Sequence, residues 1–390
     1  MKKFIVHWSD GIRTISELIF TGEKRTGELI ISDGNKTRQH VDAVKSIVET
    51  DAYRRAREEE WRRLLSTLSF SAMNQRETGI QEASLDTVNW VFSKTLPNGL
   101  QCNFRQWLQS DQKIFWITGK PGSGKSTPMK FLVRNPQTPT YLRGSSVQIL
   151  RYFFFELGNH HLQKQYIGCL RTLLYQILNQ DDGLLDELIL AQPVFKTKQY
   201  DNDWHQNELI DSLSWCLNSR SSKFCIFLDG LDEAQKDDRD AVVDLVIRLG
   251  SLPNVKVCVS SRPENMFKTR FGSNYASLRM QDLTNSAIET YVQNTLKNRG
   301  SSVRMTEQQY RDLVRMIQQK AEGVFLWVVL TLNELIQGID SGNSTEELFT
   351  LLQELHPVLH RLYKQMWERR NGNQVYFKQQ AVEIFWLACK

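Results

Sequence analysis

A run of nine residues, Gly119 to Thr127, has the spacing of a phosphate-binding loop, because it reads GKPGSGKST and fits G-x-x-x-x-G-K-[ST]. Glycines let a backbone approach a phosphate closely, and the amides of such a loop and of the helix after it point at the anion. Lys125 adds a positive charge for the β- and γ-phosphate oxygens, and Ser126 supplies a hydroxyl for Mg²⁺. The predicted nucleotide contacts are Gly119, Lys120, Pro121, Gly122, Ser123, Gly124, Lys125, Ser126 and Thr127.

The flanks of this loop fit the same chemistry. Residues 114–117 are apolar and predict a short buried strand, and apolar residues return at helical spacing from Met129 onward. Strand, glycine loop and helix is the order that the motif requires. The simpler alternative is a glycine-rich turn that only caps a helix, and this context disfavours it.

An acidic cluster follows a second apolar run at 223–228. Asp229 ends the strand that this run predicts, where a carboxylate can reach Mg²⁺ at the phosphate loop. Ser126 and Asp229 are therefore the predicted metal ligands. Asp232 and Glu233 can orient or deprotonate an attacking water. The alternative is that these two residues only cap the next helix with negative charge.

A lone arginine completes the predicted catalytic set of Asp232, Glu233 and Arg262. Arg262 follows a further predicted strand at 255–259, and a guanidinium suits the geometry of a phosphate. Arg262 could therefore sense the γ-phosphate. The alternative is an exposed arginine before the turn-forming Pro263.

The fold that positions these residues is predicted to be α/β. Apolar strands at 114–117, 147–155, 223–228 and 255–259 alternate with helical patterns, which indicates a parallel sheet with helices on both faces. The strand at 147–155 intervenes in sequence, so we expect the loop strand and the Asp229 strand not to be direct neighbours. From about residue 282 onward only helical spacing remains.

Composition limits the class of protein. With 390 residues, 41% hydrophobic and 24% charged, the chain can bury the cores of two or three globular domains. A net charge of +5 is too weak to indicate binding to nucleic acid or to an anionic membrane. The longest apolar run, 324–330, is too short for a membrane span. The six cysteines show no metal or C-x-x-C spacing, which predicts a reduced, cytoplasmic protein.

These motifs together resemble a known family. Residues 115–127, 228–233 and 259–263 are similar to the Walker A, Walker B and sensor motifs of the NACHT domain of fungal NOD-like receptors, and of the nephrocystin-type P-loop domain. The resemblance covers about residues 68 to 340. It implies a STAND-class P-loop NTPase with Asp229 on Mg²⁺, Asp232 and Glu233 at the hydrolytic water, and Arg262 as sensor.

The resemblance also implies a function and a domain organisation. The family switches between a closed ADP-bound and an open ATP-bound, self-associating state, so we expect slow hydrolysis of ATP or GTP with Mg²⁺. In a fungus this would serve non-self recognition or programmed cell death, through an unidentified signalling partner. The expected parts are an N-terminal, partly helical region at 1–68, the P-loop domain with its connector at 69–280, a helical domain at 281–345, and the start of a winged-helix-like region at 346–390.

Three features depart from the family pattern. Pro128 stands where an aliphatic residue is usual, within the first turns of the predicted helix, where it removes a backbone donor. Phe325 stands where the family has the proline of its Gly-x-Pro region, which closes the nucleotide pocket. No C-terminal repeats of the kind that sense ligands follow, so the chain could be a truncated product or a short paralogue. A non-hydrolysing scaffold and a P-loop kinase therefore stay as alternatives, although the sequence shows no arginine-bearing lid.

Overall fold

The computed structural model describes residues 34–82, 89–92, 104–142, 146–272, 274–282, 284–297 and 305–358, with Arg361 and Lys364. The chain divides into two units, Met1–Arg63 and Leu64–Lys390, which we describe separately. The predicted leader before Gly34 and most of the winged-helix-like stretch lie outside the described residues. The helix α2 (Gly34–Leu68) begins in the first unit and has its last residues in the second, and its first-unit part carries exposed ion pairs such as Arg54–Asp51 and Arg62–Glu58.

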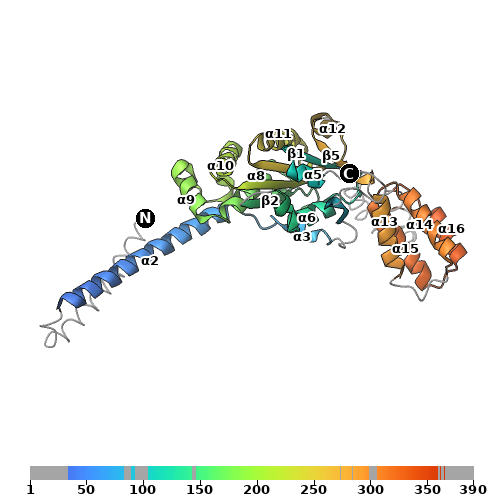
Figure 1. Cartoon of the computed structure of the whole chain (residues 1–390), viewed down its shortest axis with the longest axis horizontal. Coiled ribbons are helices and arrows are strands. Elements are labelled where there is room, and N and C mark those ends of the chain that lie inside the picture. The colour runs from blue at the N-terminus through green and yellow to red at the C-terminus, as the bar shows by residue number, and fades with distance from the viewer. Residues whose placement is uncertain are drawn as a thin grey trace, which may run out of the picture. The chain divides into compact units, whose positions relative to one another are not determined.

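The second unit is built on a parallel sheet with the strand order β2-β3-β4-β1-β5 (Figure 1). The prediction that the loop strand and the Asp229 strand are not neighbours is confirmed, because β4 lies between β1 and β3. The strand predicted at 147–155 is instead the edge strand beside β3. The fifth strand, beside β1, was not predicted, because its short pattern mixes polar and apolar residues. The strands are β1 (Ile114–Thr118), β2 (Val147–Phe153), β3 (Lys223–Asp229), β4 (Val255–Ser261) and β5 (Ala276–Arg279).

Alternating residues of β1 reach the two faces of the sheet, as the period of two in a strand requires. Phe115 and Ile117 pack into a core cluster with Met129 of the helix that follows the phosphate loop. Trp116 faces the other way and lies 6.0 Å, ring to ring, from Phe271. All five residues of β1 are buried, so the strand is held firmly in the sheet and fixes the position of the phosphate loop that follows Thr118.

Helices cover both faces of the sheet, as the sequence predicts for a parallel sheet. Figure 1 shows α10, α11 and α12 on one side and α3 and α6 on the other. Short 3-10 turns connect several of these elements. The described helices between α2 and the last strand are α3 (Gln75–Gly79), α5 (Phe104–Gln109), α6 (Ser126–Arg134), α7 (Gln137–Tyr141), α8 (Tyr166–Leu178), α9 (Asp182–Ala191), α10 (Gln206–Asn218), α11 (Arg239–Gly250) and α12 (Asn265–Phe271).

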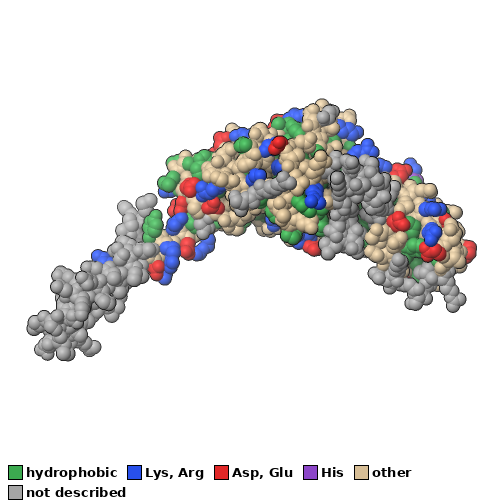
Figure 2. All heavy atoms as spheres, in the orientation of Figure 1, with side chains coloured by type: hydrophobic (Ala, Val, Ile, Leu, Met, Phe, Trp, Pro, Cys, Tyr) green, Lys and Arg blue, Asp and Glu red, His purple; other side chains and the backbone are tan. Residues whose placement is uncertain are grey.

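A helical bundle follows the sheet, as predicted from residue 282 onward. Its helices bury their own core, which includes Val292, Ile317, Trp327 and Leu352. They are α13 (Thr284–Lys297), α14 (Glu307–Ala321), α15 (Phe325–Asp340) and α16 (Thr345–Glu354). Among the described residues, no helix combines the length and apolar character needed to cross a membrane. Figure 2 shows acidic and basic side chains intermixed on the face drawn, in line with the small net charge.

Candidate functional site

The phosphate loop begins where β1 ends and finishes where α6 begins. Gly122 and Gly124 have φ angles of 69° and 84°. This left-handed conformation is strained for residues with a Cβ, which explains glycine at both positions. The loop therefore has the strand–turn–helix geometry that the sequence predicts, with the first turn of α6 next to it.

Lys125 folds back over this loop in the structure. Its Nζ donates to the carbonyl oxygens of Gly119, at 2.9 Å, and Lys120, at 3.2 Å. Burial lowers the pKa of Lys125, while Asp232 and Asp229 act in the opposite direction. The cation is thus held near the loop by weak neutral acceptors, which an anionic phosphate would outcompete.

Pro128 lies in the first turn of α6, two residues after Ser126. The first amides of a helix have no intrahelical acceptor, so proline removes no helical hydrogen bond there. The turn is intact on both sides, since the amides of Thr127 and Met129 donate to Gly124 and Lys125. The departure from the family pattern at Pro128 is therefore compatible with a formed phosphate loop.

Asp229 lies at the end of β3 and is 1% exposed. Ser260, on the adjacent strand β4, donates its hydroxyl to Asp229 Oδ1 and accepts the amide of Gly230 at 2.9 Å. Burial raises the pKa of Asp229, and hydrogen bonds from Ser126 and Ser260 oppose that rise. Sequence reasoning missed Ser260, although a serine at the buried end of a strand beside Asp229 is a signal for such a contact.

The predicted metal ligands are thus brought together. The hydroxyl of Ser126 reaches Asp229, whereas Asp229 Oδ2 is buried and has no hydrogen-bond partner. A buried carboxylate oxygen without a donor is costly, and a hard cation would satisfy it. No set of three or more His, Cys, Asp or Glu side chains in the described part of the chain could hold a metal. Mg²⁺ needs no such set, because it usually binds one or two carboxylates together with substrate phosphates. The residues present therefore fit Mg²⁺.

Glu233 points to the same end of the sheet as Asp229. Its Oε2 accepts the amide of Glu156 at 3.3 Å, and its Oε1 lies 3.5 Å from Arg76 Nη2. Burial raises the pKa of Glu233 to about 7; Arg76 opposes this rise, and Asp229 and Asp232 add to it. A carboxyl that titrates near neutral pH suits proton transfer to or from water.

Asp232 is bound to Arg262, so two of the predicted catalytic residues form a pair. Arg262 Nε lies 2.8 Å from Asp232 Oδ2, and the amide of Arg262 donates to Oδ1 at 2.9 Å. Arg239 also donates to the backbone carbonyl of Asp232. Both carboxylate oxygens of Asp232 therefore contact Arg262, whereas Glu233 faces Arg76. A role for either residue at a hydrolytic water stays a prediction.

The N-terminus of α15 contacts the phosphate loop without the family's proline. The amide of Leu326 donates to Gly122 O at 3.0 Å, and Lys120 pairs with Glu322 at 3.1 Å. A Cβ added to Gly124 would lie 3.8 Å from Phe325 Cβ. Because the main hydrogen bond is a backbone one, Phe325 can occupy the proline position and keep the contact.

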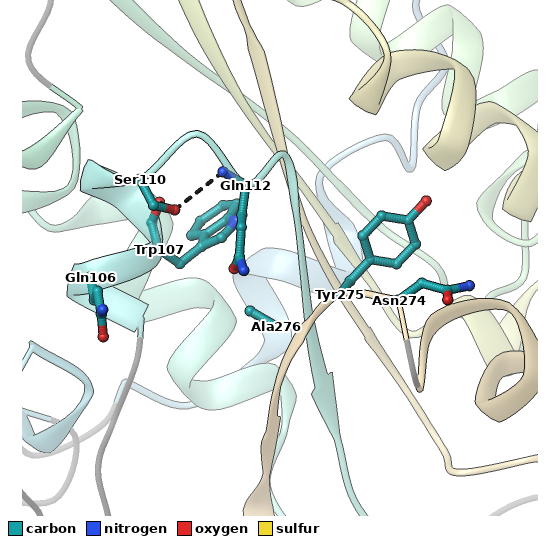
Figure 3. Close-up of a pocket in the computed structure, with 7 residues that line it drawn as sticks. All are labelled: Gln106, Trp107, Ser110, Gln112, Asn274, Tyr275 and Ala276. Carbon is teal, nitrogen blue, oxygen red and sulfur yellow. Dashed lines mark hydrogen bonds between the residues drawn. The ribbon is translucent and has the colours of Figure 1, made fainter.

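A pocket of about 410 Å³ lies elsewhere, beside the start of β1 and β5 (Figure 3). Its lining includes Trp107, Gln112 and Tyr275, and the hydroxyl of Ser110 accepts the amide of Gln112 at 3.2 Å. It therefore lies at the amino ends of the strands, whereas the phosphate loop and Asp229 follow the carboxyl ends. In open parallel sheets ligands bind at the carboxyl ends, so this pocket does not belong to the nucleotide site.

Comparison with known proteins agrees with this geometry. Residues 86–262 match the family model of Nephrocystin 3, N-terminal. The chain is also 23% identical over 292 residues to the vegetative incompatibility protein HET-E-1 of Podospora anserina, a fungal NACHT protein. These two matches support a NACHT-type domain in this chain. The alignment covers 73% of this chain and 20% of HET-E-1, so the chain spans about a fifth of that relative.

Two solved structures resemble the chain at a low level. PCH-2 of C. elegans has a TM-score of 0.36 and 11% identity, over 79% of this chain and 68% of that chain. Drosophila ORC bound to DNA has a TM-score of 0.38 and 10% identity, over 80% and 77%. These likenesses are too low to add detail to the NACHT-type domain. Its α/β P-loop architecture follows from the strand order and the loop itself.

Proposed function

We propose that this chain is a nucleotide-operated signalling switch that binds ATP or GTP with Mg²⁺ and hydrolyses it slowly. One observation carries the proposal: the hydroxyl of Ser126 lies against a buried Asp229 whose Oδ2 has no hydrogen-bond partner, directly beside a formed phosphate loop. The loop amides and Lys125 would bind the phosphates. Slow turnover suits a switch, which must remain in each of its states.

The remaining residues divide the chemistry between them. Ser126 and Asp229 would hold Mg²⁺, which when bound supplies charge neutralisation at the phosphate oxygens. Glu233 would orient the attacking water and accept its proton. Arg262 would sense the γ-phosphate, and Asp232 would position Arg262 through their double contact. Asp232 would thus have two roles, because it would position Arg262 and would also lie near the attacking water.

The biological setting is part of the proposal. The name of the relative HET-E-1, a vegetative incompatibility protein, supports a role in fungal non-self recognition or programmed cell death. Self-association in the ATP-bound state and an unidentified signalling partner are proposed with it, as is a cytoplasmic location. The described cysteines, which are Cys169, Cys216, Cys225 and Cys258, are free and buried, in line with that location.

Nucleotide binding by a Lys125→Ala variant tests the proposal. We expect ATP and GTP affinity to fall at least about tenfold, since a charge-assisted contact to phosphate contributes on the order of 1.5–3 kcal/mol. Lys268→Ala, on the exposed side of α12, is the matched control and should bind as the parent does. If Lys125→Ala bound both nucleotides as tightly as the parent, the proposed site would be wrong.

The same assay separates the alternative functions. A non-hydrolysing paralogue would bind nucleotide and release no phosphate, whereas a scaffold with a degenerate pocket would bind neither ADP nor ATP. A kinase would release ADP only when an acceptor is present. Identifying the nucleotide that co-purifies with the protein would show at once whether the pocket works and which base it prefers.

A further inference from the structure

Arg76 reaches the acidic site from a segment that precedes the P-loop strand. It lies in the short helix α3, and its Nη2 is 3.5 Å from Glu233 Oε1. The guanidinium carbon also lies 4.9 Å from the ring centre of Phe155, and Arg76 Nε is buried without a partner. Both side chains of the pair are mostly buried, with 29% and 22% exposed. Among the residues that the structure describes, Arg76 is thus the ion-pair partner of the Glu233 carboxylate.

The segment that carries Arg76 is fixed to the domain at its start. Arg171 of α8 is 2% exposed, and its guanidinium donates to the carbonyl oxygens of Thr67, Leu68 and Ser69. These carbonyls include the last ones of α2, which have no partner within the helix. The end of α2 is therefore tied to α8 by one buried cation.

The same segment is fixed again just after Arg76. The buried Glu77 pairs with Arg134 at the end of α6, at 3.1 Å, and with Arg151 on β2, at 2.6 Å. Lys130, also on α6, donates to Ile80 O. A five-residue helix is not stable alone, so these anchors determine where α3 and its Arg76 lie.

We propose that Arg76 is a positioning residue that orients the Glu233 carboxylate for hydrolysis, so that residues 67–80 set the hydrolysis rate. This inference rests on the proposed function of the site. Apart from its pairing with Arg76, the Glu233 carboxylate accepts a hydrogen bond from the backbone amide of Glu156 in the described part of the chain. A planar guanidinium held over Phe155 and paired with Glu233 Oε1 favours one orientation of that carboxylate. Movement of α3 would remove that preference without touching the phosphate loop.

Steady-state ATP hydrolysis by Arg76→Gln, Arg76→Lys, Glu233→Gln and the double variant Arg76→Gln/Glu233→Gln tests the proposal. We expect Arg76→Gln to lower kcat by about tenfold to a hundredfold, the effect typical of losing a group that orients a functional residue, with KM unchanged. Arg76→Lys should restore part of the loss. In the Glu233→Gln background the Arg76→Gln change should have no further effect. Arg315→Gln, whose side chain is 70% exposed on α14, is the matched control and should behave as the parent does.

Three results would overturn the inference. The first is an unchanged kcat in Arg76→Gln. The second is a raised KM with unchanged kcat, which would mean that Arg76 binds the nucleotide directly. The third is equal loss in the parent and in the Glu233→Gln background, which would mean that Arg76 acts independently of Glu233.

Thermal unfolding of the nucleotide-free protein supplies a second measurement. The Tm shifts of Arg76→Gln and Glu233→Gln should not add in the double variant, because the two side chains contact each other. Additive shifts would contradict the contact even if turnover were too slow to measure. If Lys125→Ala abolished nucleotide binding while Arg76→Gln left kcat unchanged, only the role of Arg76 would fail. If the parent bound no nucleotide, both the proposed function and the role of Arg76 would fail.

Discussion

Asp232 holds Arg262 by two contacts, one to the side chain and one to the backbone. Arg262 Nε lies 2.8 Å from Asp232 Oδ2, and the Arg262 amide lies 2.9 Å from Oδ1. The side chain of Asp232 is 4% exposed and that of Arg262 is 22% exposed. The end of β4 is therefore tied to the acidic segment after β3, and the predicted sensor is oriented by a residue first expected at the hydrolytic water.

Loss of Arg262 should destabilise the domain more than loss of the pair. Arg262→Ala leaves a buried carboxylate without its cation, so we expect about 1–3 kcal/mol less unfolding free energy. In an Asp232→Asn background the same change should cost much less. Denaturant unfolding of the single and double variants measures this. The exposed pair Arg315–Asp312 is the control, and its coupling should be within about 0.5 kcal/mol of zero.

Protonation of Glu233 should make stability depend on pH. Its pKa is about 7 in the folded protein and lies near 4.3 in an unfolded chain. Between these values the folded state binds more protons than the unfolded state, so the unfolding free energy falls as pH rises. Glu233→Gln has no titrating carboxyl at this position, so it removes this fall in unfolding free energy. Relative to the parent, its stability should therefore rise by about 1–3 kcal/mol between pH 4.5 and pH 7.5.

Urea unfolding of the metal-free protein at several pH values measures that difference. Glu59→Gln, on an exposed position of α2, is the matched control. A constant stability difference between Glu233→Gln and the parent across this pH range would contradict the raised pKa of Glu233.

Gly124 and Gly342 separate backbone strain from nucleotide binding. Their φ angles are 84° and 83°, but Gly124 lies in the phosphate loop and Gly342 in an open turn between α15 and α16. Alanine at either position should cost about 1–2 kcal/mol of unfolding free energy, because both force a Cβ into the left-handed region. Only Gly124→Ala should also weaken ATP binding, as titrated by calorimetry. Equal affinity in both variants would argue against a phosphate role for the loop.

Ser260 should affect Mg²⁺ binding through its hydrogen bond to Asp229, although it lies within a strand. Ser260→Ala removes the donor to Asp229 and the acceptor of the Gly230 amide, so we expect about 1–3 kcal/mol lower stability. The pKa of Asp229 should rise further, because the lost hydrogen bond had lowered it. Nucleotide binding should therefore need more Mg²⁺, most visibly at low pH. Ser222→Ala, before the other end of β3, should leave the Mg²⁺ dependence unchanged.

Sequence patterns predicted which segments form strands and helices better than they predicted which of these elements lie side by side. The buried strands that end at Thr118 and Asp229 were predicted because short apolar runs with turn residues after them have few other interpretations. The edge strand β5, with its pattern of mixed polarity, was missed. Order within the sheet depends on crossover connections, so the sequence indicated only that β1 and β3 were not neighbours. The strand between them proved to be β4.

The sequence alone determined the phosphate loop, the acidic segment and the α/β class, because each depends on local residue types and on periodicity. Tertiary structure decided the partners. It placed Asp232 on Arg262, Ser260 on Asp229 and Arg76 on Glu233. The first contact joins the segments that follow the neighbouring strands β3 and β4, the second joins those two strands, and the third joins residues 157 positions apart. No local pattern specifies such contacts, since they arise only when the packed sheet and its anchoring segment bring distant side chains together.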